Sequence, residues 1–175
     1  LEDAAAPWEA LHVAHALSRS GELDLVHNRA DWLPLAFDRY ARAPLVTTIH
    51  GFSSRAILPA YQRSHSAVAS ISFADRAPEL TYVANVYHGV DLAELPFSPD
   101  GGDSLVAYRR GAMPEIVDEG VTGFVDTNAD EAVAAVATAT TLDRALCRQT
   151  AEQRFSADRM VGDYLRVYEL VLAAR

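Results

Sequence analysis

One short run of residues, from Leu45 to His50, constrains the fold of this chain more than any other feature of the sequence. Its β-branched residues favour a strand, and its hydrophobicity shows little period-two alternation. A strand with one solvent-exposed face alternates in hydrophobicity, whereas a strand covered on both faces does not. The run therefore predicts a strand inside a parallel sheet that helices cover on both faces.

Other predicted elements alternate along the first half of the chain. Sequence patterns predict three helices, and three more short apolar runs predict strands. These segments are, in chain order, the helix 7–17, the strand 23–27, the helix 32–40, the short helix 57–62, the strand 67–72 and the strand 82–87. This alternation predicts an α/β fold with a Rossmann-like parallel sheet and right-handed crossovers.

The second half of the chain begins after a segment rich in proline and glycine, residues 96–104. Later patterns predict a strand at 105–108, a short helix after Gly111, a strand near 120–125 and helices at 130–138, 143–154 and 157–173. We expect a first domain at residues 1–98 and a second at 99–175, with the last helix packing back on the first domain. Alternatively, the halves merge into one three-layer domain, because each has few strands with which to close its own core.

Composition excludes several classes of protein. Half of the residues are hydrophobic, and 15 basic residues, all arginine, face 24 acidic ones for a net charge of −9. An acidic surface disfavours a nucleic-acid partner. No apolar stretch reaches the ~18 residues of a membrane span, and the N-terminus lacks the pattern of a signal peptide, so we expect a cytoplasmic protein. The single cysteine, Cys147, predicts a buried structural thiol.

Polar residues at predicted strand ends supply the candidate site residues. Parallel sheets bind ligands outside the carboxyl ends of their strands. The candidate pairs are 27–28, 50–51 and 88–89, each beginning with a histidine. From spacing alone, His50 is either a site residue or a cap of its strand, and the other two pairs are better interpreted as an ordinary loop and a structural turn. His12 and His15 lack metal-ligand spacing, so we expect no metal site.

Several runs, taken in order, resemble the family 4 glycosyltransferases, which are two-domain enzymes of the GT-B type. The runs are 24–27 (DLVH), 44–51 (PLVTTIHG), 86–91 (VYHGVD), 111–124 (GAMPEIVDEGVTGF) and 154–161 (RFSADRMV). The resemblance implies a retaining, metal-independent transfer of a sugar from a nucleotide-sugar donor to an acceptor hydroxyl on a small molecule or glycan, without a cofactor.

The resemblance also implies roles for three residues. His50 is expected to reach the transferred sugar as the catalytic residue, and Gly51 to let the backbone pass close to a ligand. Glu115, which follows Pro114 at the start of a short helix, is expected to border the donor pocket. Its helix position also fits simple capping, because a carboxylate is favoured near a helix N-terminus.

The sequence departs from the family pattern in two places. The family's first strands would precede Leu1, and most of its donor site would fall inside residues 103–110, where its diphosphate-binding Arg and Lys and its Glu-x7-Glu motif are absent. A non-catalytic truncated remnant or binding module is therefore the alternative, and a nucleotide-sugar epimerase of the same fold fits less well. Missing neighbours would leave sheet edges exposed, so we expect self-association.

Overall fold

The computed structural model describes residues 5–51, 54–99 and 105–174. The fold is α/β with parallel strands, as predicted, and is consistent with an abbreviated Rossmann-like arrangement. The chain divides into two compact units. The first contains the described residues up to Ile71, the segment Arg76–Val86 and the chain from Tyr164 onward, and the second contains Ser72–Asp75 and Tyr87–Asp163.

The first unit is built on a four-stranded sheet in the order β1-β2-β3-β4, with every neighbouring pair parallel. Its elements are α1 (Ala5–Ser18), β1 (Val26–Asn28), β2 (Leu45–Ile49), α2 (Leu58–Arg63), β3 (Ala67–Ser70) and β4 (Ala84–Asn85), with the 3-10 helices η2 (Ser20–Glu22), η3 (Leu33–Tyr40) and η4 (Arg55–Ile57). The last helix, α6 (Ala157–Ala173), belongs to this unit from Tyr164 onward.

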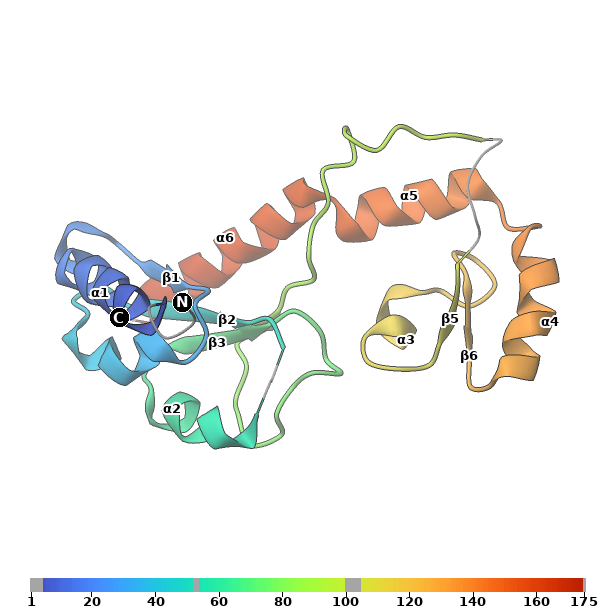
Figure 1. Ribbon diagram of the computed structural model, residues 1–175. Helices are drawn as coiled ribbons and strands as arrows, with labels where there is room; N and C mark the ends of the chain where they lie inside the picture. The colour runs from blue at the N-terminus through green and yellow to red at the C-terminus, as the bar shows by residue number, and fades with distance from the viewer. Residues whose placement is uncertain (1–4, 52–53, 100–104, 175) are drawn as a thin grey trace. The chain divides into compact units, whose positions relative to one another are not determined.

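Strand β2 is buried along its whole length, which confirms the interpretation of its sequence. On one face of the sheet, Leu45 packs against Val13 and Leu17 of α1, and Ile49 packs in a cluster with Tyr61 of α2. On the opposite face, Thr48 lies against α6. Figure 1 shows α2 and α6 on opposite sides of β2 and β3. Successive residues of a strand point to opposite sides, so Leu45 and Ile49 face one layer of helices and Thr48 faces the other.

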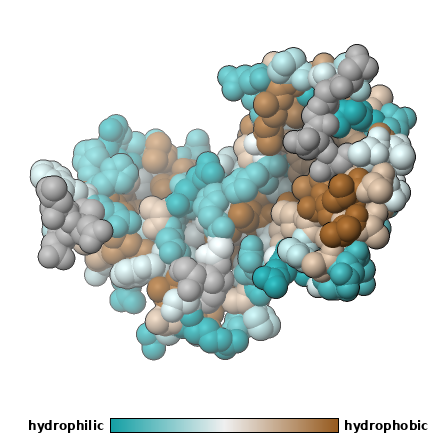
Figure 2. All heavy atoms as spheres, turned by 45° about the vertical axis from the view of Figure 1, so that its right-hand side comes forward, coloured by the Kyte–Doolittle hydropathy of each residue, from teal (hydrophilic) through white to brown (hydrophobic). Residues whose placement is uncertain are grey.

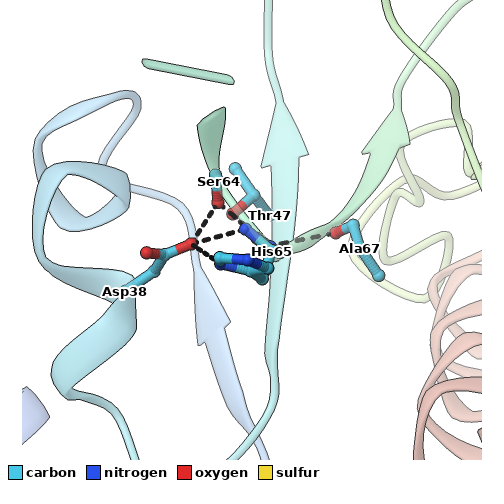
Figure 3. Close-up of polar contacts among 6 residues, drawn as sticks. Asp38, Thr47, Ser64, His65 and Ala67 are labelled. Atoms are coloured by element: carbon cyan, nitrogen blue, oxygen red, sulfur yellow. Dashed lines mark hydrogen bonds and ion pairs between the residues drawn. The ribbon is translucent and has the colours of Figure 1, made fainter. Parts of the chain in front are cut away.

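A buried carboxylate fixes the entry to β3. The Asp38 side chain, 9% exposed, accepts hydrogen bonds from Ser64 Oγ at 2.7 Å and from the backbone N–H of His65 at 2.6 Å (Figure 3). Next to it, Thr47 Oγ1 lies 2.7 Å from Ser66 Oγ. These contacts tie the loop after α2 to η3 and β2, so that β3 begins in register beside β2.

Several element boundaries differ from the predicted ones. Residues 33–40 form a 3-10 helix with Pro34 in its first turn. Strand β1 starts only at Val26, because the backbone N–H of Leu23 bonds to Ser20 and closes η2. Strand β4 has two residues, although the backbone N–H of Val83 still reaches Val68.

The second unit has a smaller sheet. Its elements are β5 (Val106–Tyr108), α3 (Met113–Ile116), β6 (Phe124–Asp126), α4 (Ala129–Ala139), α5 (Arg144–Phe155) and the first turns of α6. Strands β5 and β6 pair in parallel, and α4 packs along both (Figure 1). Side chains cap the N-termini of three helices, with Asn128 at α4, Asp143 at α5 and Ser156 at α6. The Oγ of Ser156 accepts a hydrogen bond from the backbone N–H of Arg159, as the sequence predicts for this residue.

Apolar surface remains exposed on the second unit. Val133 and Val136 of α4 are 74% and 57% exposed, and the face drawn in Figure 2 carries a brown hydrophobic area. Cys147 is only half buried, so the prediction of a buried thiol is wrong in degree. Its Sγ lies 3.2 Å from the carbonyl oxygen of Val121 because α5 packs over that turn rather than inside a closed core.

Candidate functional site

A pocket of about 240 Å³ lies in the first unit at the carboxyl ends of β1 and β2. Its described lining residues are Arg29, Asp31, Thr48, His50 and Gly51. His50 and Gly51 follow β2 directly, and Arg29 and Asp31 follow β1. Ligands of parallel α/β sheets bind in this position, because side chains from neighbouring strand ends meet there.

The loop after β1 is held by the side chain of Asn28. This buried residue accepts a hydrogen bond from the backbone N–H of Ala30 at 2.9 Å and donates to the carbonyl oxygen of Asp31 at 2.9 Å. Its amide also reaches Thr47 Oγ1 at 3.2 Å. The interpretation of residues 27–28 as an ordinary loop therefore misses a turn that Asn28 builds at the pocket wall.

Asp31 is held in an uncommon backbone conformation at this wall. Its φ of 57° lies in the left-handed region, which L-residues other than Asn, Asp and Gly rarely adopt. The hydroxyl of Tyr61 donates a hydrogen bond to Asp31 Oδ1, and burial followed by this contact raises the pKa of Tyr61. Tyr61 therefore stays protonated and keeps donating to the carboxylate, which fixes the side chain at the pocket.

Arg29 and His50 contact each other across the two strand ends. Arg29 Nε donates to His50 Nε2 at 3.3 Å. The accepting nitrogen must carry a lone pair, so this contact requires the unprotonated imidazole with its proton on Nδ1. His50 is exposed, and a Cβ added to Gly51 would meet nothing within 4 Å. Neighbouring protein atoms therefore do not require glycine at this position.

A second polar cluster lies beneath the pocket, on the face of the sheet that α6 covers. His27 Nε2 lies 2.8 Å from Thr48 Oγ1, and His27 Nδ1 lies 2.7 Å from the hydroxyl of Tyr168. Thr48 Oγ1 also lies 3.0 Å from the hydroxyl of Tyr164. Burial, and then the charges of Arg29 and His50, lower the pKa of His27 to about 4. At neutral pH its uncharged ring links the sheet to α6 and adds no charge to the site.

Glu115 belongs to the second unit and is not among the lining residues of the His50 pocket. Its Oε2 accepts from the backbone N–H of Phe73 at 2.9 Å and from the hydroxyl of Tyr87 at 2.8 Å, and its Oε1 accepts from Ala74 N at 2.6 Å. The carboxylate thus fastens the segment 72–75 to α3. These three donors lie outside α3.

The third histidine pair, His88–Gly89, lies in an irregular segment that packs against the start of α6. A Cβ on Gly89 would lie 2.7 Å from Ala157 Cα, so the backbone approach requires glycine. Val90 bridges to Ser156, and Arg159 Nη2 donates to the carbonyl oxygen of His88 at 3.2 Å. These contacts join the segment 88–90 to the start of α6.

The structure thus brings two of the three predicted site residues, His50 and Gly51, into one pocket. Sequence reasoning missed Arg29 and Asp31 as partners of His50. The available signal was their position directly after a predicted strand, together with the rule that neighbouring strand ends share one sheet edge.

The described parts of the chain, residues 5–51, 54–99 and 105–174, contain no group of three or more His, Cys, Asp and Glu side chains arranged to hold a metal ion. Within the same ranges, no helix combines the length and apolar character that crossing a membrane requires. Searches of protein-family models and of curated proteins find no match to this chain.

Proposed function

We propose that the pocket at the ends of β1 and β2 binds a sugar, and that the chain is a glycosyltransferase of the retaining, metal-independent GT-B type in abbreviated form. The donor would be a nucleotide sugar and the acceptor a hydroxyl of a small molecule or glycan. The observation that carries the proposal is the convergence of His50, Gly51, Arg29 and Asp31 on one pocket at the carboxyl edge of a parallel sheet.

The chemistry of the lining residues suits a polyhydroxylated ligand. The Asp31 carboxylate accepts hydrogen bonds, the Arg29 guanidinium donates them, and the exposed His50 ring can donate from Nδ1 while its Nε2 accepts from Arg29. Gly51 has no side chain, so a ligand can approach the backbone at the end of β2 closely. Such a mixture of donors and acceptors on a rigid strand edge can orient the hydroxyl groups of a sugar ring.

Transfer also requires stabilisation of the leaving diphosphate. Without a metal, the negative charge that develops on it must be met by positioned cations or helix N-termini. The sequence has no lysine, so only arginine could supply a permanent cation. In the expected donor-side segment, the Glu115 carboxylate is already bonded to Phe73, Ala74 and Tyr87.

That engagement of Glu115 favours a second candidate function, a non-catalytic binding module that retains the sugar pocket. The two candidates share the pocket and differ in turnover. A carboxylate fixed by three protein donors would have to release them before it could contact a donor sugar.

The test is donor hydrolysis and transfer by the purified chain with UDP- and GDP-sugars, combined with calorimetric binding of the same compounds. For the enzyme, we expect turnover that His50→Ala abolishes and that His12→Ala, on an exposed face of α1, leaves intact. Binding that depends on His50 without turnover would establish the binding module instead. Absence of both binding and turnover would refute the sugar site.

A further inference from the structure

Arg29 has hydrogen-bonding capacity that the fold of the first unit does not use. A guanidinium carries five N–H donors. Arg29 Nε donates to His50 Nε2, and among the described residues no acceptor bonds the two terminal nitrogens. Arg29 is exposed and lines the pocket. Four N–H donors in a planar fork are therefore available there, in the geometry that binds two oxygens of a phosphate or carboxylate at once.

The electrostatic surroundings make Arg29 the cation that a ligand would meet in this pocket. His27, underneath, is uncharged at neutral pH because its pKa is lowered to about 4. Among the described lining residues only Asp31 is acidic, and its carboxylate already accepts from Tyr61. The chain as a whole carries a net charge of −9, so a permanent cation at a strand end contrasts with the surface around it.

The size of the pocket limits the ligand. At about 240 Å³, it is smaller than the roughly 300–1,000 Å³ of sites that enclose drug-sized ligands. A single sugar or polyol ring with one charged substituent fits this volume better than a complete nucleotide sugar. Such a ligand would place its hydroxyl groups at Asp31 and His50 and its anionic group at Arg29.

We propose that the pocket binds a sugar or polyol that carries a phosphate, with Arg29 as the residue that selects the charged ligand. This inference rests on the proposed function, because it names the substrate class of the same site.

The test compares three probes, glucose 6-phosphate, glucose and inorganic phosphate, by calorimetry on the full chain. We expect glucose 6-phosphate to bind at least about tenfold more tightly than glucose, and this preference to shrink as salt rises from 50 to 200 mM. Arg29→Gln should lower the affinity for glucose 6-phosphate to that for glucose. Arg29→Lys should retain part of the preference, because lysine keeps the charge and loses the fork.

The control is Arg63→Gln, which removes another exposed arginine of the first unit, at the end of α2, and should leave the preference unchanged. Thermal melting of each variant checks that it is folded. Equal binding of glucose and glucose 6-phosphate, both lost in His50→Ala, would overturn the role of Arg29 and leave the sugar site standing. Absence of binding by either sugar would overturn both proposals. Inorganic phosphate binding as tightly as glucose 6-phosphate would overturn the assignment of a sugar or polyol.

Discussion

The two units of this chain build parallel sheets of different completeness. In the first unit, β2 has a neighbouring strand on each side and is covered on both faces, so that Val46 is 0% exposed. In the second unit, β5 and β6 have only each other, and the buried apolar residues among those described are Val117, Val125, Ala135 and Ala139. The same type of local sequence therefore produces a closed core in one unit and a thin one in the other.

The difference lies in how much apolar surface each sheet can bury. A parallel strand is stable when helices cover both faces of its sheet, because the apolar side chains on both faces are then buried. The first unit provides α1, α2 and the second half of α6 for this purpose. In the second unit, Val133 of α4 stays 74% exposed. The candidate pocket lies in the unit with the larger and more fully buried sheet, which is the better support for a binding geometry.

The strongest test of this comparison is a matched pair of core substitutions. Val46→Ala in β2 should lower the free energy of unfolding by about 2–3 kcal/mol, and Val125→Ala in β6 by about 1–2 kcal/mol, because a thinner core relaxes more readily around a cavity. Urea unfolding followed by circular dichroism measures both. Val133→Ala is the exposed control and should change stability by less than about 0.5 kcal/mol. A cost at Val125 equal to that at Val46 would break the comparison.

The next effect concerns the buried carboxylate at the entry to β3. Asp38→Ala should destabilise the first unit by about 1–3 kcal/mol, because Ser64 Oγ and the backbone N–H of His65 lose their acceptor. Asp24→Asn, at an exposed position before β1, is the control with little expected change. Hydrogen exchange of β3 amides would locate the loss. Unchanged protection of β3 in Asp38→Ala would show that this contact does not set the strand.

A smaller effect depends on pH. The pKa of His27 is about 4 when folded and 6.5 ordinarily, so the unfolded chain binds more protons between these values. The stabilisation that depends on an uncharged His27 is therefore fully present above pH 6.5, and it is lost as the pH falls through 4. Because the ring is only partly buried, we expect about 1–2 kcal/mol. Thermal melting between pH 7.5 and 4 should show a shallower decline for His27→Gln than for the control His12→Gln. An equal decline of the melting temperature with pH in both variants would contradict this dependence of stability on the protonation of His27.

The smallest effect on stability is expected at the exposed surface of the second unit. The apolar face of α4 and the open edges of β5 and β6 predict concentration-dependent self-association. Changing Val133 and Val136 together to serine should reduce it, with a stability change within about 0.5 kcal/mol. Size-exclusion chromatography over a range of concentrations measures this. A wild-type chain that elutes as a clean monomer at high concentration would contradict the prediction.

Sequence patterns predicted much of the fold because they report local burial and capping. The five buried residues of β2 match a run without alternation, and the end of α1 at Ser18 lies within one residue of the predicted end. Two boundaries differed from the prediction, at Leu23, whose backbone N–H closes η2 on Ser20, and in the short strand β4. For the site, His50 could be singled out from the sequence, whereas its contact with Arg29 could not.

The sequence by itself determined that this chain forms a parallel α/β fold and that His50 and Gly51 end a buried strand. The hydrophobic pattern and the β-branched residues that indicate a buried strand lie within one short run, so the sequence of that run is enough to predict the strand. Only the tertiary structure decided that Arg29 meets His50 and that His27 reaches Tyr168, which is 141 residues away. Those contacts follow from the register of β1 against β2 and from the placement of α6 on the sheet, and neither is encoded in any local pattern.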